Sequence, residues 1–489
     1  MRCAGVVTCL VLSIFVPIAV LWGNQPKAGS QTCSECGLEL VDADLARVGG
    51  GDEDATEVIQ RIVDRGGDIR LPSGTYRITR PIVVDLAKTG FVSITGGSAV
   101  RLIMAGPGPA LKLIGTHRGT ADPSTVKPEV WQQQRMPLID TLEIVGAHPQ
   151  AGGVEAVGTM QLTISRLTVR SALHGIHLPN HNRNVIVSDC HLYNNRGVGL
   201  YLDSINLHQI NVIGCHISYN VGGGIVVRDS SVCNLQINGC DIEANMAPDR
   251  PATANVLIDT AGGPNASAEF AIVGCTIQHR HGCPDSANVR FNGTNLEDRI
   301  SEDRVWGNLV IGDNVMSDAE INIDIRNGRG VSIVGNTLWR GYQYNLRIEE
   351  SSNVAIGPNV LDRNPRYYWG GEHARNGVLL RNCDAITVTG LHLNDVRHPE
   401  AGLIIDNCRR VNLDGCTILN CDHGGLLLRD SVGCRVSDCL IANDKSRSEV
   451  WRSLVVSGGC ENMVVDNLLG VSEDIDPAAA HANGNIVQP

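Results

Sequence analysis

The sequence contains few aromatic residues, very little lysine and almost no helical patterning. Aromatic side chains make up 4% of the 489 residues. Beyond residue 65, apolar residues do not recur with the helical period over any useful length, which argues against a fold built from helices. So few lysines also exclude a lyase that uses a lysine base on the strand face described below. The lysines are Lys27, Lys88, Lys112, Lys127 and Lys445.

Positive charge is in the minority. The formal net charge is −12 at pH 7, whereas a general nucleic-acid binder presents a broad basic surface to the phosphate backbone. The charge balance therefore argues against nucleic acid as a partner.

A short repeat occupies most of the chain, from Val185 to Leu469, and recurs roughly every 22 to 35 residues. In Ile210–Ile217 and Leu235–Ile242, apolar and polar residues alternate with the period of a strand. A second strand motif recurs between these segments, as in Gly199–Leu202. Such short units cannot bury their apolar faces alone, so the copies must stack. The sequence predicts an all-β fold, a single-stranded right-handed parallel β-helix (a solenoid).

Two other repeat architectures fit the pattern less well. A β-propeller needs longer blades linked by hairpins. A leucine-rich repeat keeps a fixed frame of Leu and Asn in every unit, and this frame is missing. Glycine accounts for 54 residues, which suits the tight corners of a solenoid.

The N-terminal segment is the one long apolar run. Residues 4–22 follow a single Arg2 and resemble an export signal, with length close to that of a membrane span. We therefore expect residues 1–30 to be an export signal or a membrane anchor and residues 31–48 a linker. The protein would be secreted, periplasmic or on the cell surface, and would touch a membrane only through this segment if it is not cleaved.

Seventeen cysteines in an exported chain would ordinarily indicate disulfides. Their positions favour a different interpretation, because six of them occupy one place in the repeat, and Asn314 and Asn336 take that place in intervening coils. Equivalent positions of stacked coils align at a spacing of about 4.8 Å, so we expect a buried ladder of free thiols and amides. A second, shorter ladder would join Cys383, Cys408 and Cys460, and Cys33 and Cys36 stay open as a disulfide or half of a metal site. The six cysteines are Cys190, Cys215, Cys240, Cys275, Cys416 and Cys439.

The segment Gly49–Gln60, followed by Gly66–Ile78, resembles the N-terminal segment of the pectate-lyase-like right-handed parallel β-helix superfamily, as found in rhamnogalacturonase- and epimerase-type enzymes and phage tailspikes. Its residues predict a short helix with a capping box of Asp54 and Glu57, which ends at Gly66 and covers the open end of the solenoid. With the repeats, the resemblance covers residues 49–470, the expected β-helix, and leaves 471–489 as a C-terminal tail. The resemblance implies the fold. It does not indicate a particular enzyme family, because the motifs of pectin hydrolases and alginate epimerases are mostly missing.

The second strand of each coil defines two outward columns. Its aliphatic residues point inward, so the residues between and just after them point outward. Reading along the axis, the first column is His177, Tyr201, Val226, Leu257, Arg290, Asp324, Arg347, Leu379, Ile404 and Leu427. The second column is Pro179, Asp203, Arg228, Asp259, Asn292, Arg326, Glu349, Arg381, Asp406 and Arg429.

Long insertions are expected to wall this face. They comprise Met246–Asn255, Gln278–Ala287, Leu296–Trp306 and Asp362–Asn376. The last contains Tyr367, Tyr368, Trp369 and His373, side chains suited to stacking on sugar rings. The alternative interpretation is an ordinary ladder of ion pairs on a solvated strand face.

The charged face suggests an anionic polysaccharide, because guanidinium groups match carboxylates and sulfates. A hydrolase would use Asp324 and Glu349, which the coil spacing places about 8 Å apart, within the range of an inverting enzyme. A lyase would take its base from an arginine, His177 or Tyr201, and Asp203 or Asp259 would hold Ca²⁺ against the uronate. Asp259 is thus both a catalytic and a metal candidate. The arginines expected to bind substrate are Arg228, Arg290, Arg326, Arg347 and Arg381.

The sequence therefore predicts an exported β-helix protein that cleaves a uronate-containing or sulfated polysaccharide, either as a glycoside hydrolase, slightly favoured, or as a polysaccharide lyase. No cofactor follows from the sequence beyond the Ca²⁺ of the lyase mechanism. The alternative is a non-catalytic carbohydrate-binding or cell-surface solenoid, and a continuous Arg–Asp ladder filling the face would favour it.

Overall fold

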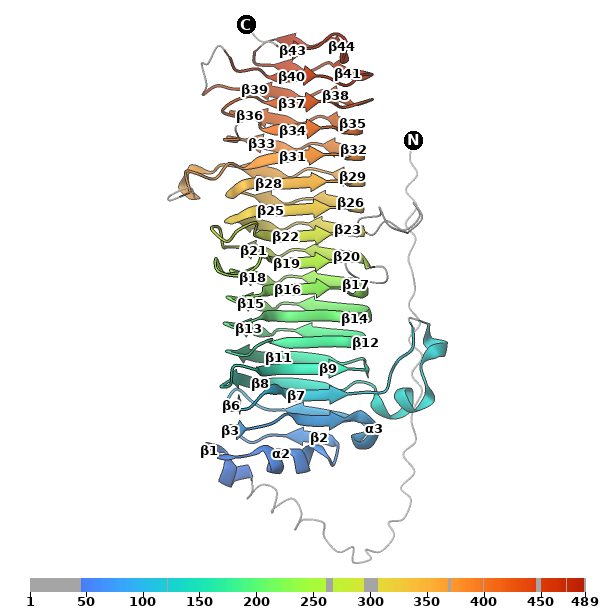
Figure 1. Cartoon of the computed structure of the whole chain (residues 1–489), viewed down its shortest axis with the longest axis vertical. Coiled ribbons are helices and arrows are strands. Elements are labelled where there is room, and N and C mark those ends of the chain that lie inside the picture. Colours follow the sequence, from blue (N-terminus) through green and yellow to red (C-terminus); the bar gives the residue numbers. More distant parts are fainter. Residues whose placement is uncertain are drawn as a thin grey trace, which may run out of the picture.

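The computed structural model describes residues 45–487, apart from 121, 261–266, 294–306, 368–370, 399, 446–449 and 472. The expected export signal, Tyr368 and Trp369 lie outside the described residues. Within them, the strands stack as the coils of one elongated parallel solenoid (Figure 1). No helix of the described part is long and apolar enough to span a bilayer.

Each coil contributes one strand to each of three parallel sheets. In sheet 1, which carries the two predicted outward columns, the strands are β4 (Ile82–Asp85), β7 (Gly108–Ile114), β9 (Ala151–Val157), the first parts of β12 (Ile176–Ser188) and β14 (Val198–Ile213), β16 (Gly223–Arg228), β19 (Ala254–Asp259), β22 (Ala287–Asn292), β25 (Ala319–Arg326), β28 (Gly341–Glu349), β31 (Gly377–Arg381), β34 (Leu403–Asp406), β37 (Leu426–Arg429), β40 (Leu454–Ser457) and β43 (Asp474–Ile475).

Sheet 2 follows sheet 1 within each coil. Its strands are β2 (Gly67–Arg70), β5 (Val92–Thr95), the first parts of β8 (Leu138–Gly146) and β11 (Thr163–Arg170), the second parts of β12 and β14, β17 (Ser231–Asn238), β20 (Ala268–Val273), β23 (Gly307–Gly312), β26 (Arg329–Val334), β29 (Ser352–Ile356), β32 (Asp384–Thr389), β35 (Arg409–Asp414), β38 (Arg435–Ser437), β41 (Asn462–Val465) and β44 (Ala480–Asn483). The short β10 (Thr159–Met160) pairs with β12 at the corner between the two sheets.

Sheet 3 completes each coil. Its strands are β1 (Gly50–Asp54), β3 (Gly74–Ile78), β6 (Val100–Met104), the second parts of β8 and β11, β13 (His191–Tyr193), β15 (His216–Ser218), β18 (Asp241–Glu243), β21 (Thr276–Gln278), β24 (Val315–Ser317), β27 (Thr337–Leu338), β30 (Val360–Asp362), β33 (His392–Asn394), β36 (Thr417–Leu419), β39 (Leu440–Ala442), β42 (Leu468–Leu469) and β45 (Ile486–Val487). Because β43, β44 and β45 continue the stack, the solenoid extends past the expected boundary at residue 470 into the segment expected to be a tail.

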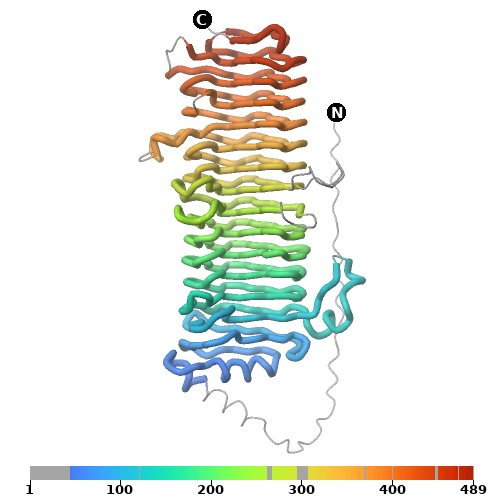
Figure 2. The backbone as a smooth tube through the Cα atoms, viewed as in Figure 1, coloured from blue at the N-terminus to red at the C-terminus, as the bar shows by residue number. Residues whose placement is uncertain are grey.

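The helices lie at the N-terminal end of the stack and in segments that project from its sides (Figure 1). They are α2 (Thr56–Val63), α3 (Leu86–Thr89), η1 (Pro123–Thr125), η2 (Val130–Gln134) and η5 (Pro365–Tyr367). In Figure 2 the segment that contains η1 and η2 projects from the otherwise regular coils. The helix α2 lies across the first coils, as expected, and buries Val58, Ile59 and Val63. The expected capping box is wrong. The Asp54 carboxylate accepts the amide of Thr56, but Glu57 pairs with Arg80 instead of turning back to the helix start.

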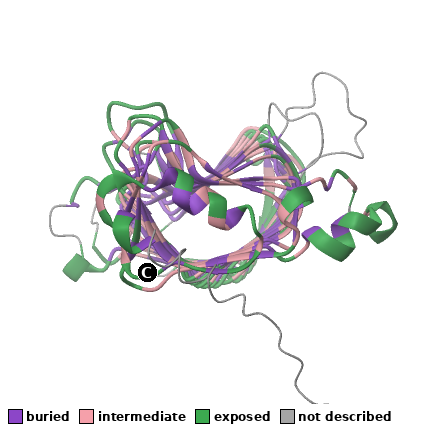
Figure 3. Ribbon diagram, turned by 90° about the horizontal axis from the view of Figure 1, so that it is seen from below, coloured by how far each residue is buried: buried purple, intermediate pink, exposed green. Residues whose placement is uncertain are grey.

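The core is a column of aliphatic side chains inside the three sheets (Figure 3). The predicted ladder of cysteines and asparagines lines its corner between sheets 2 and 3. The amide of Cys215 lies 3.5 Å from the sulfur of Cys240, and Cys275 donates to Asn314 over 2.9 Å. These cysteines are buried and free. The second predicted ladder, of Cys383, Cys408 and Cys460, departs from the prediction after Cys408. Ser431 accepts the backbone amide of Cys408 in the next coil, and Cys460 is exposed and not buried.

A further ladder of seven buried asparagines lies between sheets 3 and 1 and was not predicted from the sequence. The side-chain amides of the first six donate to the side-chain oxygen of the next along the axis, over 2.7–2.9 Å. Because these six amides have partners, the polar row costs the core little, and within the row the amide nitrogen of Asn345 alone has no hydrogen-bond partner in the described structure. Its members are Asn195, Asn220, Asn245, Asn255, Asn288, Asn322 and Asn345.

Candidate functional site

The two outward columns predicted from the sequence are present on sheet 1. The strand register pairs His177 with Tyr201, and continues residue by residue through Arg290, Asp324 and Arg347. It also pairs Asp203 with Arg228 and Arg326 with Glu349. The first column extends two coils further toward the N-terminus than predicted, because Lys112 pairs with Glu155 and Glu155 pairs with His177. A lysine therefore does lie on this face, contrary to the exclusion made from the sequence.

The centre of the first column is a cage of three arginines around Asp324, which we call the arginine cage (Arg290, Arg326 and Arg347). Asp324 is fully buried; its Oδ2 lies 2.7 Å from Nε of Arg290 and its Oδ1 lies 2.8 Å from Nε of Arg347. Burial alone would raise the pKa of Asp324, but the hydrogen bond from Arg347 and the charges of the cage outweigh it and lower that pKa. Asp324 is therefore a buried, ionised ion-pair partner and has no oxygen open to solvent.

A second carboxylate completes the cage from a loop. Asp285 lies in the insertion between β21 and β22, and its Oδ1 is 3.2 Å from Nη2 of Arg290 and 3.3 Å from Nη2 of Arg347. Insertions 246–253, 279–286 and 363–376 precede sheet 1 strands as expected. The expected insertion 296–306 lies outside the described residues, and the strand that follows it in the chain, β23, belongs to sheet 2 and not to sheet 1.

Beyond the cage, the second column forms a ladder of alternating charges. Glu349 lies 3.3 Å from Arg381, which lies 3.5 Å from Asp406, and Asp406 lies 3.0 Å from Arg429. The predicted pair of Asp324 and Glu349 is thus held by arginines on both sides. These contacts match the ion-pair interpretation and not the hydrolase interpretation of that pair.

The aliphatic residues of the first column do not form an open groove. Val226 and Leu257 pack with Ala254 and Ile321 in an apolar cluster outside the main core, and Leu379 and Ile404 pack in another. All four column residues are at most 4% exposed. This part of the face is therefore covered and not open as a cleft.

The N-terminal end of sheet 1 differs, because charges converge there on one histidine. In what we call the His177 cluster, Nδ1 of His177 lies 3.4 Å from Glu155 and Nε2 lies 3.2 Å from Asp203. Lys112 lies 2.9 Å from the Glu155 carboxylate. The ring of Tyr201 stacks on that of His177, with centroids 5.4 Å apart.

The His177 cluster separates the pKa values of neighbouring groups. Burial would lower the pKa of His177, but hydrogen bonds to the two carboxylates raise it. The hydrogen bond with His177, supported by Lys112, lowers the pKa of Glu155 to about 2. Burial lowers the pKa of His174 to about 4, and burial together with the Asp203 charge raises the pKa of Tyr201. The cluster therefore places a histidine whose pKa is raised beside one whose pKa is lowered, the separation typical of acid–base sites.

A cavity of about 260 Å³ opens beside this cluster. Glu155, His174 and His177 line it together with Pro109, Gln150 and Leu173. The neutral His174 is held in one tautomer, because its Nδ1 accepts the amide of Val198 over 3.1 Å, which leaves its proton on Nε2. Arg228, one coil beyond Asp203 in the register, makes no ion pair with any described residue. It is the candidate arginine available to an anionic ligand.

The proposed calcium ligands are not brought together. Asp203 and Asp259 lie two coils apart in the second column with Arg228 between them, and Asp259 accepts a hydrogen bond from Asn292 over 3.0 Å. Within the described ranges no three His, Cys, Asp or Glu residues gather as a metal site.

The aromatic loop lies far from the His177 cluster. Tyr367 is 53% exposed and its ring lies 6.2 Å from that of Trp339, and His373 is exposed in the same loop, between β30 and β31. That places both residues beside the coils of Glu349 and Arg381, several coils away from His177. Tyr368 and Trp369, also expected to bind substrate, lie outside the described residues.

Sequence reasoning missed Glu155, His174 and Lys112. Glu155 occupies the outward position of a strand motif, Val154-Glu155-Ala156, that extends the first column by one coil. The column could have been continued from the alternation alone. His174 precedes its strand, and only the packed corner shows that it meets His177 and Tyr201.

A comparison with protein families supports the fold. The family model described as "Right handed beta helix region" matches residues 131–277 and 372–473, about half of the chain. Among solved structures, tailspike protein 3 of bacteriophage CBA120 is 13% identical, with a TM-score of 0.43 over 92% of this chain and 63% of that one. This chain thus spans less than two thirds of that tailspike.

Two further structures show the same likeness. The tailspike of Escherichia coli bacteriophage HK620, in complex with a pentasaccharide, is 13% identical, with a TM-score of 0.48 over 85% of this chain and 77% of that one. The A-module of the Azotobacter vinelandii mannuronan C-5 epimerase AlgE6 is 13% identical, with a TM-score of 0.33 over 91% and 99%. No curated protein matches the sequence. With a stacked parallel solenoid and a family model that matches about half of its residues, the chain belongs to the right-handed β-helix family.

Proposed function

We propose that this protein acts on a polysaccharide that binds at the N-terminal end of sheet 1, and that the His177 cluster hydrolyses it. The observation that carries the proposal is His177, held between the carboxylates of Glu155 and Asp203 at the wall of a cavity. The rest of the face offers little alternative, because the arginine cage and its ladder neutralise one another.

The chemistry requires a proton donor and a carboxylate base on opposite sides of the scissile bond. His177 is the donor, since the two carboxylates raise the pKa of its imidazole and favour the protonated form. Glu155 and Asp203 lie on either side of the imidazole ring, 3.4 and 3.2 Å from its two nitrogens. One of these carboxylates would exchange its contact with His177 for a water molecule when substrate enters. Asp203 suits this role better, because Glu155 is also held by Lys112.

Arg228 supports an acidic polysaccharide as the substrate. It projects one coil beyond Asp203 and has no ion-pair partner among the described residues. A guanidinium group can bind a uronate carboxylate or a sulfate through two parallel hydrogen bonds. Export to the outside of the cell, proposed from residues 1–30, would place the protein where such polymers occur.

A second candidate is binding without cleavage. The continuous ladder from Arg290 to Arg429 fills most of the predicted face with internal ion pairs. Both nitrogens of His177 also contact carboxylates, which holds the imidazolium in place. A glycan bound beside Arg228 and not cleaved would establish this second function.

The test is incubation with uronate-containing and sulfated polysaccharides, with product detected in two ways. Hydrolysis yields new reducing ends without the ultraviolet absorbance of an unsaturated uronate, whereas a lyase yields both. The variants His177→Gln, Glu155→Gln and Asp203→Asn should each abolish the reducing ends. Glu349→Gln, which breaks the ladder outside the cluster, is the matched control and should keep full turnover.

The pH profile gives an independent readout. Because the pKa of His177 is raised, turnover should persist above pH 6.5 and fall as pH rises through that raised pKa. Full turnover in all three cluster variants would contradict the site. Retained binding by a wild type that releases no product from any polymer would instead favour the second candidate.

A further inference from the structure

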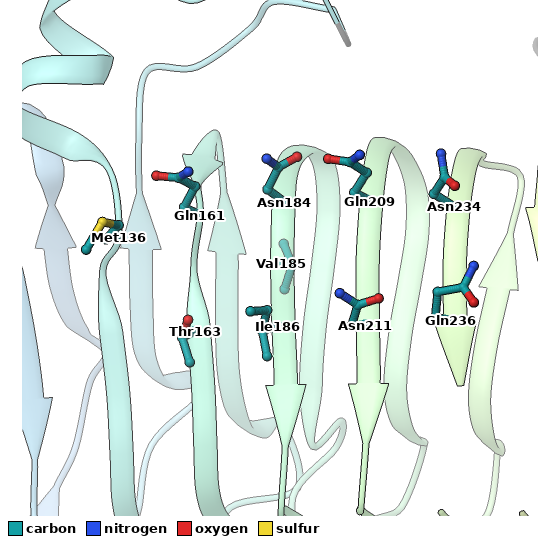
Figure 4. Close-up of a pocket in the computed structure, with 10 residues that line it drawn as sticks. All are labelled: Met136, Gln161, Thr163, Asn184, Val185, Ile186, Gln209, Asn211, Asn234 and Gln236. Atoms are coloured by element: carbon teal, nitrogen blue, oxygen red, sulfur yellow. The ribbon is translucent and has the colours of Figure 1, made fainter. Parts of the chain in front are cut away.

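A groove of about 560 Å³ runs over the outer face of sheet 2, one sheet away from the His177 cluster. Figure 4 shows two rows of side chains crossing successive coils, with Met136 at one end. The first row is Gln161, Asn184, Gln209 and Asn234, and the second is Thr163, Ile186, Asn211 and Gln236. We propose that this amide groove is a binding site for a neutral, hydroxyl-rich oligosaccharide that lies along the solenoid axis.

The six amide side chains of the groove have unused hydrogen-bonding capacity. None of them hydrogen-bonds another described residue through its side chain, although equivalent positions recur at about 4.8 Å from coil to coil. The inner asparagine ladder has the same coil spacing and is bonded from end to end. Amides stacked at this spacing can therefore hydrogen-bond one another, as they do inside the core. Those of the outer rows do not, so their donors and acceptors are available to a ligand.

Two of these acceptors are already shielded from water. The carbonyl oxygens of Gln161 and Asn184 are buried and have no hydrogen-bond partner in the described structure. A buried unpaired acceptor is unfavourable because it has lost its hydrogen bond to water, and a donor from a ligand removes that cost. Hydroxyl groups are donors that fit both oxygens, and a sugar chain carries several on each unit.

The lining residues explain why the ligand should be neutral. None of the ten carries a charge, so a uronate or sulfate would lose its hydration without an arginine or lysine to replace it. Ile186 is 39% exposed and Met136 is 61% exposed, and these side chains give the apolar faces of sugar rings a surface to cover. The first row places one amide on each of four successive coils, which matches a linear chain of repeating units, whereas a single small molecule would use only one or two of these coils.

The site is independent of the proposed function, although the same strands carry both. The strands β12 and β14 supply His177 and Tyr201 to sheet 1 through their first parts, and Ile186 and Asn211 to the groove through their second parts. A polymer anchored on sheet 2 would be kept near sheet 1. Binding in the groove does not require that His177 be catalytic.

Calorimetric titration of the full chain with cello-, manno- and chito-oligosaccharides tests the proposal, with oligogalacturonate as the charged counterpart. We expect at least one neutral series to bind, with an affinity that changes little with salt. The double variant Asn211→Ala with Gln236→Ala should weaken that binding at least tenfold. Asn412→Ala is the matched control, because Asn412 is outward on sheet 2 in a distant coil, and it should bind like the wild type.

A conservative variant guards against a folding defect. Asn184→Asp keeps the side-chain shape and should weaken neutral binding at least tenfold while the melting temperature stays within a few degrees. Three outcomes would overturn the site: no neutral oligosaccharide binds, the groove variants bind as the wild type does, or oligogalacturonate binds best and is released by salt. His177→Gln should leave groove binding intact, so loss of turnover there and loss of binding here are separable results.

Discussion

Replacing Arg347 by methionine tests whether the arginine cage is structural. The substitution keeps much of the side-chain volume but removes the guanidinium that holds both oxygens of Asp324. Breaking a buried ion pair costs about 3–5 kcal/mol, because a charge is left buried without its partner. Arg290 stays 2.7 Å from the carboxylate and retains part of the stabilisation. We therefore expect a loss of about 2–4 kcal/mol.

The matched control is Arg435→Met on sheet 2. Arg435 pairs with Asp414 over 3.3 Å, with both side chains well exposed, so its loss should cost at most about 1 kcal/mol. Adding Asp324→Asn to Arg347→Met should restore part of the stability, because the unpaired buried charge disappears.

Urea unfolding gives the free energies, and hydrogen exchange shows whether the loss is centred on β25 and β28, as the nearest-neighbour stability of a solenoid requires. A cost for Arg347→Met equal to that of Arg435→Met would refute the structural role. Asp324→Asn with unchanged stability and no turnover would return Asp324 to the list of catalytic candidates.

Three further outcomes follow from the structure. Burial lowers the pKa values of His117 and His174 to about 4, so on acidification the unfolded chain takes up protons at these histidines before the folded chain does. The free energy of unfolding should therefore fall as pH drops from 6.5 toward 4, by on the order of 2 kcal/mol for each histidine. Unchanged urea midpoints across this range would contradict the prediction. Among the described cysteines, Cys460 should react quickly with a thiol reagent, whereas the cysteines of the buried ladder should react only after unfolding. Disulfides within the ladder, found by mass spectrometry, would refute this prediction. The substitution Cys240→Ser should lower the free energy of unfolding by about 1–3 kcal/mol if the hydroxyl lacks a partner. Arg228→Ala should weaken binding of acidic glycans, and the difference from wild type should shrink at high salt as screening increases; equal binding at low salt would remove Arg228 from the site.

The sequence by itself determined the solenoid, its outward columns and the ladder through Cys215 and Asn314. These features depend on two periods, the alternation along a strand and the repeat from coil to coil, and both are written into the order of residues. His177, Tyr201 and Asp324 therefore occupy the predicted column. Glu155 follows from the same two periods, continued one coil further.

Only the tertiary structure decided which of those outward residues are available to a ligand. Asp324 becomes a buried ion-pair partner because the cage arginines reach it from its own and neighbouring coils, with Asp285 of a loop contacting the same arginines. Side-chain reach is not encoded by strand periodicity. The same holds for the groove on sheet 2. Asn184 and Asn195 are both asparagines in one coil, yet Asn195 lies inside the core and fully bonded, whereas the Asn184 side chain faces the groove unbonded. Backbone corners that a strand pattern does not specify determine which amide turns inward and which turns outward.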